Sequence, residues 1–212
     1  MNTTFHKDNF TSLCDRLARK DADLKGIITR YGHPPMWSRP NTFQTLVLTI
    51  LEQQVSLAAA YAAFKRLRTH IGLVTPEKIL KLTDEEFRHC YFTRQKTVYA
   101  RELATAIVNK ELRLRQLAQE DNDTIRTQLK KIKGIGDWTV DIYLLHVLQR
   151  ADIFPLGDIA LLNSIKHIKQ LDAGTPKEEL LKMSTAWQPY RSIATMLFWH
   201  DYIQRKGIRI QG

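Results

Sequence analysis

The sequence has few cysteines and no long apolar run, and each shortage excludes a class of protein. Its 212 residues include two cysteines, Cys14 and Cys90, which lie far apart and outside any metal-ligand spacing. That number excludes a four-cysteine iron–sulfur or zinc site and fits a reducing compartment. Residues 1–10 are polar, and no apolar stretch approaches the roughly 20 residues that cross a bilayer. We therefore expect a cytoplasmic protein without membrane contact.

Strand patterns and internal repeats are missing as well. No segment shows a convincing alternation of apolar and polar residues, whereas short segments with helical periodicity follow one another along the chain. Apolar residues make up 43% and charged residues 25%, which is ordinary globular usage and argues against disorder. The sequence therefore predicts an all-α protein with a packed core.

Acidic residues are too few to balance the basic ones. The chain has 32 Lys and Arg against 22 Asp and Glu, a formal net charge of +10, and a pI of about 9.7. Such an excess favours a polyanionic partner such as nucleic acid. A soluble protein that is merely basic remains the alternative on charge alone.

Several helix starts can be placed from local signals. Ser56 is a predicted cap for a helix over 57–71, and Thr75 followed by Pro76 predicts another start. Thr83 and Glu86 have the spacing of a capping box. The segment 43–51 is apolar nearly all round, which predicts a helix in the middle of a bundle.

A Gly-x-Gly turn joins two helical stretches at Gly134-Ile135-Gly136. Glycine takes a positive φ at little cost and lets another backbone approach closely. Exposed N–H groups at the start of the second helix can bind a phosphate oxygen, and Lys130, Lys131 and Lys133 lie beside the turn. A simple tight turn between helices is the alternative interpretation.

Asp158 follows Phe154-Pro155 and directly precedes the apolar segment that starts at Ile159. One interpretation is a helix N-cap, for which aspartate is well suited. The other is a carboxylate presented at the end of a loop for chemistry. Asp152, which lies before the same Phe-Pro pair, is the nearest rival and is interpreted as a turn residue.

Four motifs together resemble one known family. The hairpin reads Leu-x-x-Ile-Lys-Gly-Ile-Gly-x-Trp-Thr over 129–139, and Phe-Pro-x-x-Asp follows over 154–158. The segments Glu-Gln-Gln-Val-Ser over 52–56 and Trp-Gln-Pro-Tyr-Arg-Ser over 187–192 complete the set. Their content and order resemble the helix-hairpin-helix DNA glycosylases, and within them the alkyl-base, or 3-methyladenine, branch.

The resemblance implies a fold and an activity. It implies two helical lobes with a DNA-binding cleft between them: an inserted lobe over 39–145 with the helix-hairpin-helix, and a second lobe from 1–38 plus 146–212. The implied activity is base excision repair, in which a monomer on double-stranded DNA hydrolyses the N-glycosidic bond of alkylated purines such as 3-methyladenine and 7-methylguanine. The damaged base must be flipped out of the duplex first.

The resemblance also assigns the catalytic group. It places the family's catalytic aspartate at Asp158, whose carboxylate would stabilise the positive charge that builds on the deoxyribose. Bifunctional relatives have a lysine nucleophile two residues after the second hairpin glycine, where this chain has Trp138. The implied enzyme is therefore monofunctional and leaves the strand intact.

For the base pocket, the resemblance implies Trp138 and Trp199, whose indole faces attract a base made cationic by alkylation. A family tyrosine one turn after Trp138 is replaced by Ile142, with Tyr143 beside it. These four residues form the predicted pocket. Aromatic residues at helical positions also occur in ordinary cores, which is the alternative interpretation.

The remaining implied contacts are with the DNA strand. Gln54, with Val55, falls where the family inserts a wedge into the gap left by the flipped nucleotide, although a polar interhelical loop is an equal alternative. Glu52 departs from the small residue that is usual there. Phosphate contacts are implied for Lys133, Gly134, Gly136 and Thr139.

A monovalent cation, Na⁺ or K⁺, is implied at the hairpin through the backbone carbonyls of Lys130, Ile132 and Gly134. No other cofactor is expected. Two alternative functions stay open from the sequence: a glycosylase for deaminated or oxidised bases, and a helix-hairpin-helix module that binds DNA without catalysis.

Overall fold

The computed structural model describes residues 3–209 and is all-α over that range, as predicted. Within the described residues there is no named strand, and the one isolated β-bridge joins Thr4 to Arg150. The α-helices are α1 (Lys7–Ala18), α2 (Ala22–Tyr31), α3 (Phe43–Glu52), α4 (Leu57–Ile71), α5 (Pro76–Lys81), α6 (Asp84–His89), α7 (Arg94–Val108), α8 (Leu114–Leu117), α9 (Asn122–Lys130), α10 (Asp137–Ile142), α11 (Ile159–Ile168), α12 (Lys177–Ser184) and α13 (Arg191–Lys206). A π-helical turn, η1 (Tyr143–Val147), continues α10, and a 3₁₀ turn, η2 (Thr185–Trp187), precedes α13.

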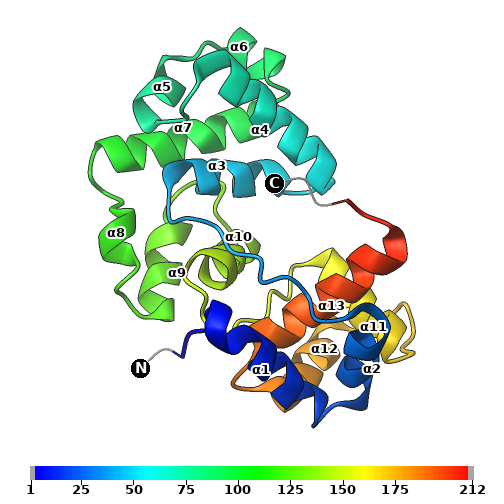
Figure 1. The fold of residues 1–212 in the computed structure, drawn as a ribbon. Coiled ribbons are helices and arrows are strands. Elements are labelled where there is room, and N and C mark those ends of the chain that lie inside the picture. The colour runs from blue at the N-terminus through cyan, green and yellow to red at the C-terminus, as the bar shows by residue number, and fades with distance from the viewer. Residues whose placement is uncertain (1–2, 210–212) are drawn as a thin grey trace. The chain divides into compact units, whose positions relative to one another are not determined.

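The chain divides into two compact units (Figure 1). The inserted unit is Arg39–Tyr143, and the terminal unit combines the residues up to Ser38 with Leu144–Arg209. The chain enters the inserted unit at the residue expected from the sequence and leaves it two residues before the expected position. Residues 210–212, which the prediction assigned to the second lobe, lie outside the described residues.

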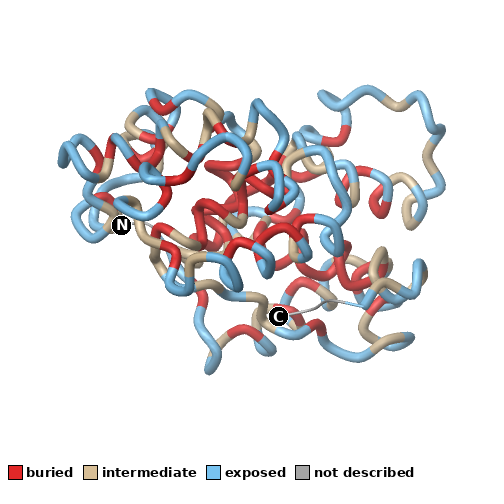
Figure 2. The backbone as a smooth tube through the Cα atoms, turned by 90° about the horizontal axis from the view of Figure 1, so that it is seen from above, coloured by how far each residue is buried: buried red, intermediate tan, exposed pale blue. Residues whose placement is uncertain are grey.

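The inserted unit is built around α3. Eight of the ten residues of α3 are buried, which agrees with its apolar sequence, and α4 and α7 pack against it. Figure 2 shows such buried segments in red along the chain. Tertiary packing on all sides stabilises this helix, because its β-branched residues have only modest intrinsic helix propensity.

The terminal unit is built around α13. An unbroken run from Ser192 to Asp201 is buried in that helix, against α1, α2 and α11 (Figure 1). Such a continuous run has no exposed face, as expected for the central helix of a bundle. The consequence for function is that residues on α13 are held rigidly with respect to α11.

The predicted helix starts are confirmed in detail. Ser56 accepts a hydrogen bond from the Ala59 N–H at 3.2 Å. Thr83 and Glu86 form the predicted capping box, in which the Thr83 N–H donates to the Glu86 carboxylate at 2.7 Å. Helix α4 has the predicted bounds, while the short α8 and the π turn η1 were not predicted. No helix in the described part of the chain is long and apolar enough to cross a membrane.

Candidate active site

Asp158 is both a helix cap and a group presented beside an aromatic side chain. Its Oδ1 accepts the Leu161 N–H at 2.8 Å, which makes it the N-cap of α11. The same oxygen accepts the Trp199 Nε1–H at 3.0 Å. Asp158 is half-buried, and the following Ile159 is 72% exposed, so the carboxylate lies at the edge of the terminal unit. The two donors on one oxygen fix the orientation of the carboxylate.

Trp199 connects Asp158 to a second ring. The imidazole of His146 stacks on the indole at a centroid distance of 5.3 Å with planes 12° apart. The Nδ1 atom of His146 lies 3.2 Å from the carbonyl oxygen of Trp37. His146 belongs to the π turn η1, an irregularity that occurs often at functional sites. A carboxylate, an indole and an imidazole therefore lie in one continuous set of contacts.

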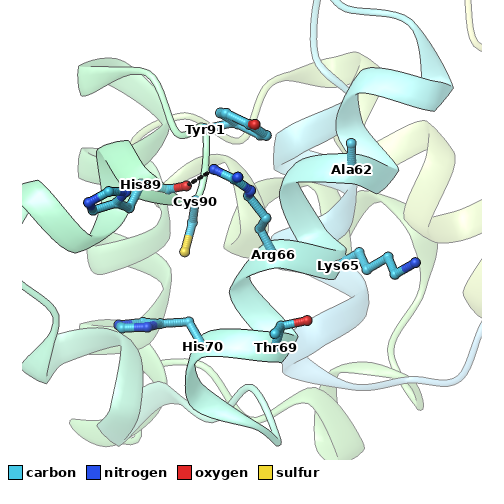
Figure 3. Close-up of a pocket in the computed structure, with 8 residues that line it drawn as sticks. All are labelled: Ala62, Lys65, Arg66, Thr69, His70, His89, Cys90 and Tyr91. Carbon is cyan, nitrogen blue, oxygen red and sulfur yellow. Dashed lines mark hydrogen bonds between the residues drawn. The ribbon is translucent and has the colours of Figure 1, made fainter.

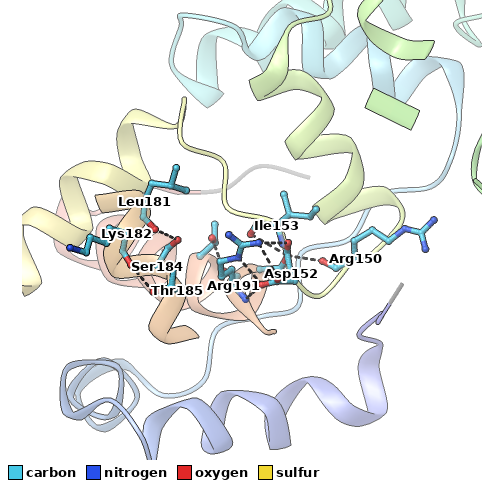
Figure 4. Close-up of polar contacts among 10 residues, drawn as sticks. Arg150, Asp152, Ile153, Leu181, Lys182, Ser184, Thr185 and Arg191 are labelled. Carbon is cyan, nitrogen blue, oxygen red and sulfur yellow. Dashed lines mark hydrogen bonds and ion pairs between the residues drawn. The ribbon is translucent and has the colours of Figure 1, made fainter. Parts of the chain in front are cut away.

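The motif 187–192 supports the loop that leads to Asp158 (Figure 4). The Arg191 guanidinium donates two hydrogen bonds to the Asp152 carboxylate, Nε to Oδ1 at 2.7 Å and Nη2 to Oδ2 at 2.9 Å. The Ser192 hydroxyl accepts the Ile153 N–H at 2.9 Å and donates to the Arg150 carbonyl at 2.6 Å. Asp152 is therefore a structural partner of Arg191, which agrees with its interpretation as a turn residue.

Removing the Ser192 hydroxyl should destabilise the protein. Ser192→Ala leaves the N–H of buried Ile153 without its acceptor, and an unsatisfied buried donor costs about 1–3 kcal/mol. Urea denaturation measures the loss directly. The exposed Ser12, whose hydroxyl donates to the Asn9 carbonyl, provides the control, and Ser12→Ala should change stability by less than about 0.5 kcal/mol. Equal stability losses in the two variants would contradict this role for Ser192.

In the inserted unit, the hairpin glycines differ in why they are needed. Gly134 has a φ of +93°, and a Cβ at that position would overlap the ring of Tyr99. Gly136 has a φ of −102° and open space around it, and it is the N-cap of α10 without a side-chain cap. Gly134 is thus required by the fold, and Gly136 leaves the first N–H groups of α10 uncovered by any capping side chain.

The hairpin lysines are not equivalent either. Lys130 is paired with Asp137, with Nζ at 2.8 and 3.0 Å from its two carboxylate oxygens. This ammonium, together with the Arg126 guanidinium, holds the pKa of Asp137 below its usual value. Lys131 and Lys133 are exposed beside the turn. Lys133 is therefore better placed than Lys130 to meet a phosphate.

Thr139 differs from the other predicted phosphate contacts. The whole residue is only 2% exposed, and its hydroxyl accepts a hydrogen bond from Gln53 at 3.0 Å. The Thr139 hydroxyl is therefore held inside the inserted unit and is not presented to a phosphate.

The predicted pocket residues fall in two environments. Trp138, in the first turn of α10, is half-buried. Ile142 and Tyr143 are buried, and the Tyr143 hydroxyl donates to Asn41 Oδ1 at 2.9 Å within the inserted unit. Tyr143 is consequently held as a core residue, and the structure does not present its ring as a stacking surface. Trp199, in the terminal unit, contacts Asp158 through its indole N–H.

Gln54 and Val55 lie at the surface between α3 and α4. Gln54 is exposed and has a φ of +57°, and Val55 is 45% exposed. A non-glycine residue in the left-handed region is uncommon and marks a constrained turn. The surface position is compatible with a wedge.

Two of the three carbonyl groups expected to hold a monovalent cation, those of Ile132 and Gly134, already have partners. The Ile132 carbonyl accepts the Ile135 N–H at 3.0 Å, and the Gly134 carbonyl accepts the Gln53 side-chain amide at 2.8 Å. A carbonyl oxygen has two lone pairs, so each can still contact an ion. Oxygen ligands of this kind suit a hard cation such as Na⁺ or K⁺.

A separate open hollow of about 620 Å³ lies over α4 and the end of α6 (Figure 3). Arg66 lies over the Tyr91 ring and donates to the His89 carbonyl at 2.9 Å, and His70 pairs with Glu86. Lys65 points away from this group. Because the basic groups do not converge, the hollow is not a candidate for the chemistry.

Two members of these contact sets were given no role from the sequence: His146 and Gln53. His146 has no motif around it, and its stacking on Trp199 depends on a contact 53 positions away along the chain. Gln53 had two available signals: its place in the motif over 52–56, and its polarity at the end of an otherwise apolar helix.

Comparison with known proteins identifies the family. The family model described as HhH-GPD superfamily base excision DNA repair protein matches residues 47–189. A putative DNA-3-methyladenine glycosylase of Bacillus subtilis is 32% identical over 84% of this chain and 65% of its own length. A second B. subtilis protein, named DNA-3-methyladenine glycosylase, is 28% identical over 92% of this chain and 68% of its own length. The chain thus spans about two thirds of these curated relatives.

Among solved structures, a 3-methyladenine DNA glycosylase of Schizosaccharomyces pombe in complex with abasic DNA aligns with a TM-score of 0.80. It is 26% identical, and the alignment covers 89% of this chain and 95% of that one. The names of these relatives confirm the family and the alkyl-base branch predicted from the four motifs. This chain belongs to the HhH-GPD superfamily of base excision DNA repair proteins.

Proposed function

We propose that this protein is a monofunctional DNA glycosylase of base excision repair that hydrolyses the N-glycosidic bond of alkylated purines in duplex DNA. The observation that carries the proposal is the geometry of Asp158. A carboxylate at the start of α11 is oriented by the Leu161 N–H and by the indole N–H of Trp199. It offers a fixed negative charge next to an aromatic surface.

The proposed reaction uses that charge on the sugar. As the C1′–N bond breaks, the bonding electrons leave with the base and positive charge builds on the deoxyribose, where a nearby carboxylate stabilises it. The oxygen of a water molecule then bonds to C1′, and its proton passes to Asp158 or to solvent. The products are a free base and an abasic site in an unbroken strand.

Alkylated purines suit this site because little acid catalysis is required. A purine alkylated at N3 or N7 is cationic and leaves as a neutral base, so no group must protonate it. Trp199 is 8% exposed, stacks on His146 and orients Asp158, so the proposed attraction of a cationic ring rests on the electron-rich indole faces of half-buried Trp138. Deaminated and oxidised bases are neutral rings, which an indole face attracts less strongly than a cationic ring.

Base release from three sets of duplexes tests this choice. Methylated, deaminated and oxidised duplexes are incubated with the protein, and the free bases are separated by chromatography. The proposal predicts release of 3-methyladenine and 7-methylguanine, with at least tenfold slower release of the other bases. Faster release of a deaminated or oxidised base would change the substrate assignment. Binding of DNA without any release would favour a non-catalytic helix-hairpin-helix module.

The absence of a lysine at position 138 predicts the outcome of a trapping experiment. Trp138 stands where bifunctional relatives have lysine, and an indole forms no Schiff base with an abasic sugar. Borohydride should therefore trap no covalent complex with damaged DNA under conditions that trap a bifunctional glycosylase. A trapped adduct would show that a lysine attacks C1′.

Several contacts complete the proposal. Exposed Lys133, the backbone N–H groups at Gly136 and after it, and a monovalent cation on the hairpin carbonyls would hold the phosphate backbone. Gln54, with Val55, would fill the gap left by the flipped nucleotide. We further propose that the protein binds double-stranded DNA as a monomer, and that it acts in the cytoplasm.

A further inference from the structure

The loop that carries Gln54 is held in a strained conformation by its surroundings. Gln54 has a φ of +57°, in the left-handed region that side chains with a Cβ rarely adopt. The residue is exposed. Its own side chain therefore contributes little to burial, and neighbouring residues must keep the turn in place.

Gln53, the preceding residue, ties this loop to the hairpin. Its side-chain amide nitrogen donates to the Gly134 carbonyl at 2.8 Å and to the Thr139 hydroxyl at 3.0 Å. A carbonyl oxygen only accepts, so the nitrogen of the amide must face it. One side chain therefore spans from the end of α3 to both the turn and the first helical turn of the hairpin.

Two basic residues hold the last turn of α3, from which the Gln54 loop starts. Arg39 forms two hydrogen bonds with the Glu52 carboxylate, at 2.5 and 2.8 Å, and the Glu52 side chain is only 7% exposed. Lys96 donates to the Leu51 carbonyl at 2.6 Å, and its burial lowers the pKa of its ammonium group. The last turn of α3 is thus anchored before the chain reaches Gln53.

We propose that Gln53 is a positioning residue that couples the phosphate-binding hairpin to the Gln54 wedge. This inference rests on the proposed function and adds to it how the wedge is placed. A phosphate held at Gly134–Thr139 fixes the hairpin against one strand, and the two Gln53 hydrogen bonds transmit that position to Gln54. These two hydrogen bonds, here called the Gln53 bridge, set how deeply the Gln54 side chain enters the duplex.

The coupling matters only when a base pair has to be opened. Flipping a paired base costs unstacking and unpairing energy, whereas an unpaired base is already available to the site. Loss of the bridge leaves Asp158 and its partners unchanged, because they belong to the terminal unit. Gln53 should therefore affect paired lesions strongly and unpaired lesions weakly.

The test uses Gln53→Met, which keeps the length of the side chain and removes both donors. Single-turnover release of 7-methylguanine is measured from a duplex with the lesion opposite cytosine and from one with the lesion opposite an abasic site. We expect release from the paired lesion to fall roughly tenfold to thirtyfold, the loss of two hydrogen bonds, and release from the unpaired lesion to change by less than about threefold. Gln119→Met, at an exposed position outside the hairpin, should match the wild type on both duplexes.

A direct readout of flipping accompanies the rates. Fluorescence of 2-aminopurine placed beside the lesion should rise on binding of the wild type and rise less with Gln53→Met. Equal losses on paired and unpaired lesions would mean that Gln53 only stabilises the fold, and unchanged release on both would mean that it positions nothing. Either result overturns the inference. If the wild type releases no base from either duplex, the proposed function itself fails.

Discussion

Replacing Asp158 by asparagine should slow base release by about a thousandfold while leaving DNA binding and folding nearly unchanged. Asparagine caps helices about as well as aspartate, and its side-chain oxygen can still accept the Leu161 N–H and the Trp199 indole N–H. The variant therefore removes the negative charge and keeps the geometry. Single-turnover release from methylated duplex, with binding followed by fluorescence anisotropy, separates the two effects.

Asp152→Asn is the matched control, because Asp152 is the nearest other aspartate on the same loop. Its carboxylate pairs with Arg191, so the variant weakens a support of the loop without removing the charge at α11. We expect some loss of stability and a change of less than about tenfold in release. Release that survives Asp158→Asn, or that is abolished only by Asp152→Asn, would contradict the assignment of the carboxylate.

Replacing Gly134 by alanine should destabilise the inserted unit by about 2–4 kcal/mol and weaken DNA binding. Two causes add. The φ of +93° is unfavourable for any residue with a Cβ, and the added methyl group would overlap the Tyr99 ring. Relief of that overlap requires the hairpin to move away from α7, which displaces the groups proposed to hold phosphate. Denaturation in urea and anisotropy titrations with duplex DNA measure both effects.

Two further variants identify the cause. Gly136→Ala meets open space at an ordinary φ, so it should cost less than about 1 kcal/mol. In Tyr99→Ala, the ring that opposes the methyl group is absent, and Gly134→Ala should then cost less than it does in the wild type. If Gly134→Ala and Gly136→Ala have the same cost, the steric explanation is wrong.

The helices that could be predicted from the sequence are those with local signals. Ser56, Thr75 and Thr83 each cap a helix, because a hydroxyl beside the first turn needs no tertiary partner to act. Helix α8 has four residues and one buried leucine, too little for a periodic pattern. The π turn after α10 was not predictable, because its one-residue insertion has no signature in residue type.

The residues of the candidate site also divide into those with a local sequence signal and those placed by tertiary packing. Asp158 as a cap follows from its neighbours in sequence, whereas the bond from Trp199 joins residues 41 positions apart and is created by the packing of α13 on α11. Tyr143 was predicted for the base pocket, yet its hydroxyl is held by Asn41 inside the inserted unit. Sequence pattern indicates that an aromatic residue is buried but does not indicate what it faces.

The two hairpin glycines also differ in surroundings that the sequence pattern does not indicate. The Gly-x-Gly pattern predicts a turn, but it treats Gly134 and Gly136 alike. Only the structure shows that Tyr99, from a helix far along the chain, closes on the first and leaves the second open. The bridge from Gln53 to this turn has the same origin, because it depends on α3 ending beside the hairpin.

We expect this chain to release alkylated bases from DNA by hydrolysis. The most direct measurement incubates the wild-type protein with a methylated duplex, separates the free bases by chromatography and examines the strand before and after alkali. The expected products are free 3-methyladenine and 7-methylguanine, with strands that break only after alkali opens the abasic sites. DNA that is bound but yields no free base, or strands cleaved by the protein alone, would contradict it.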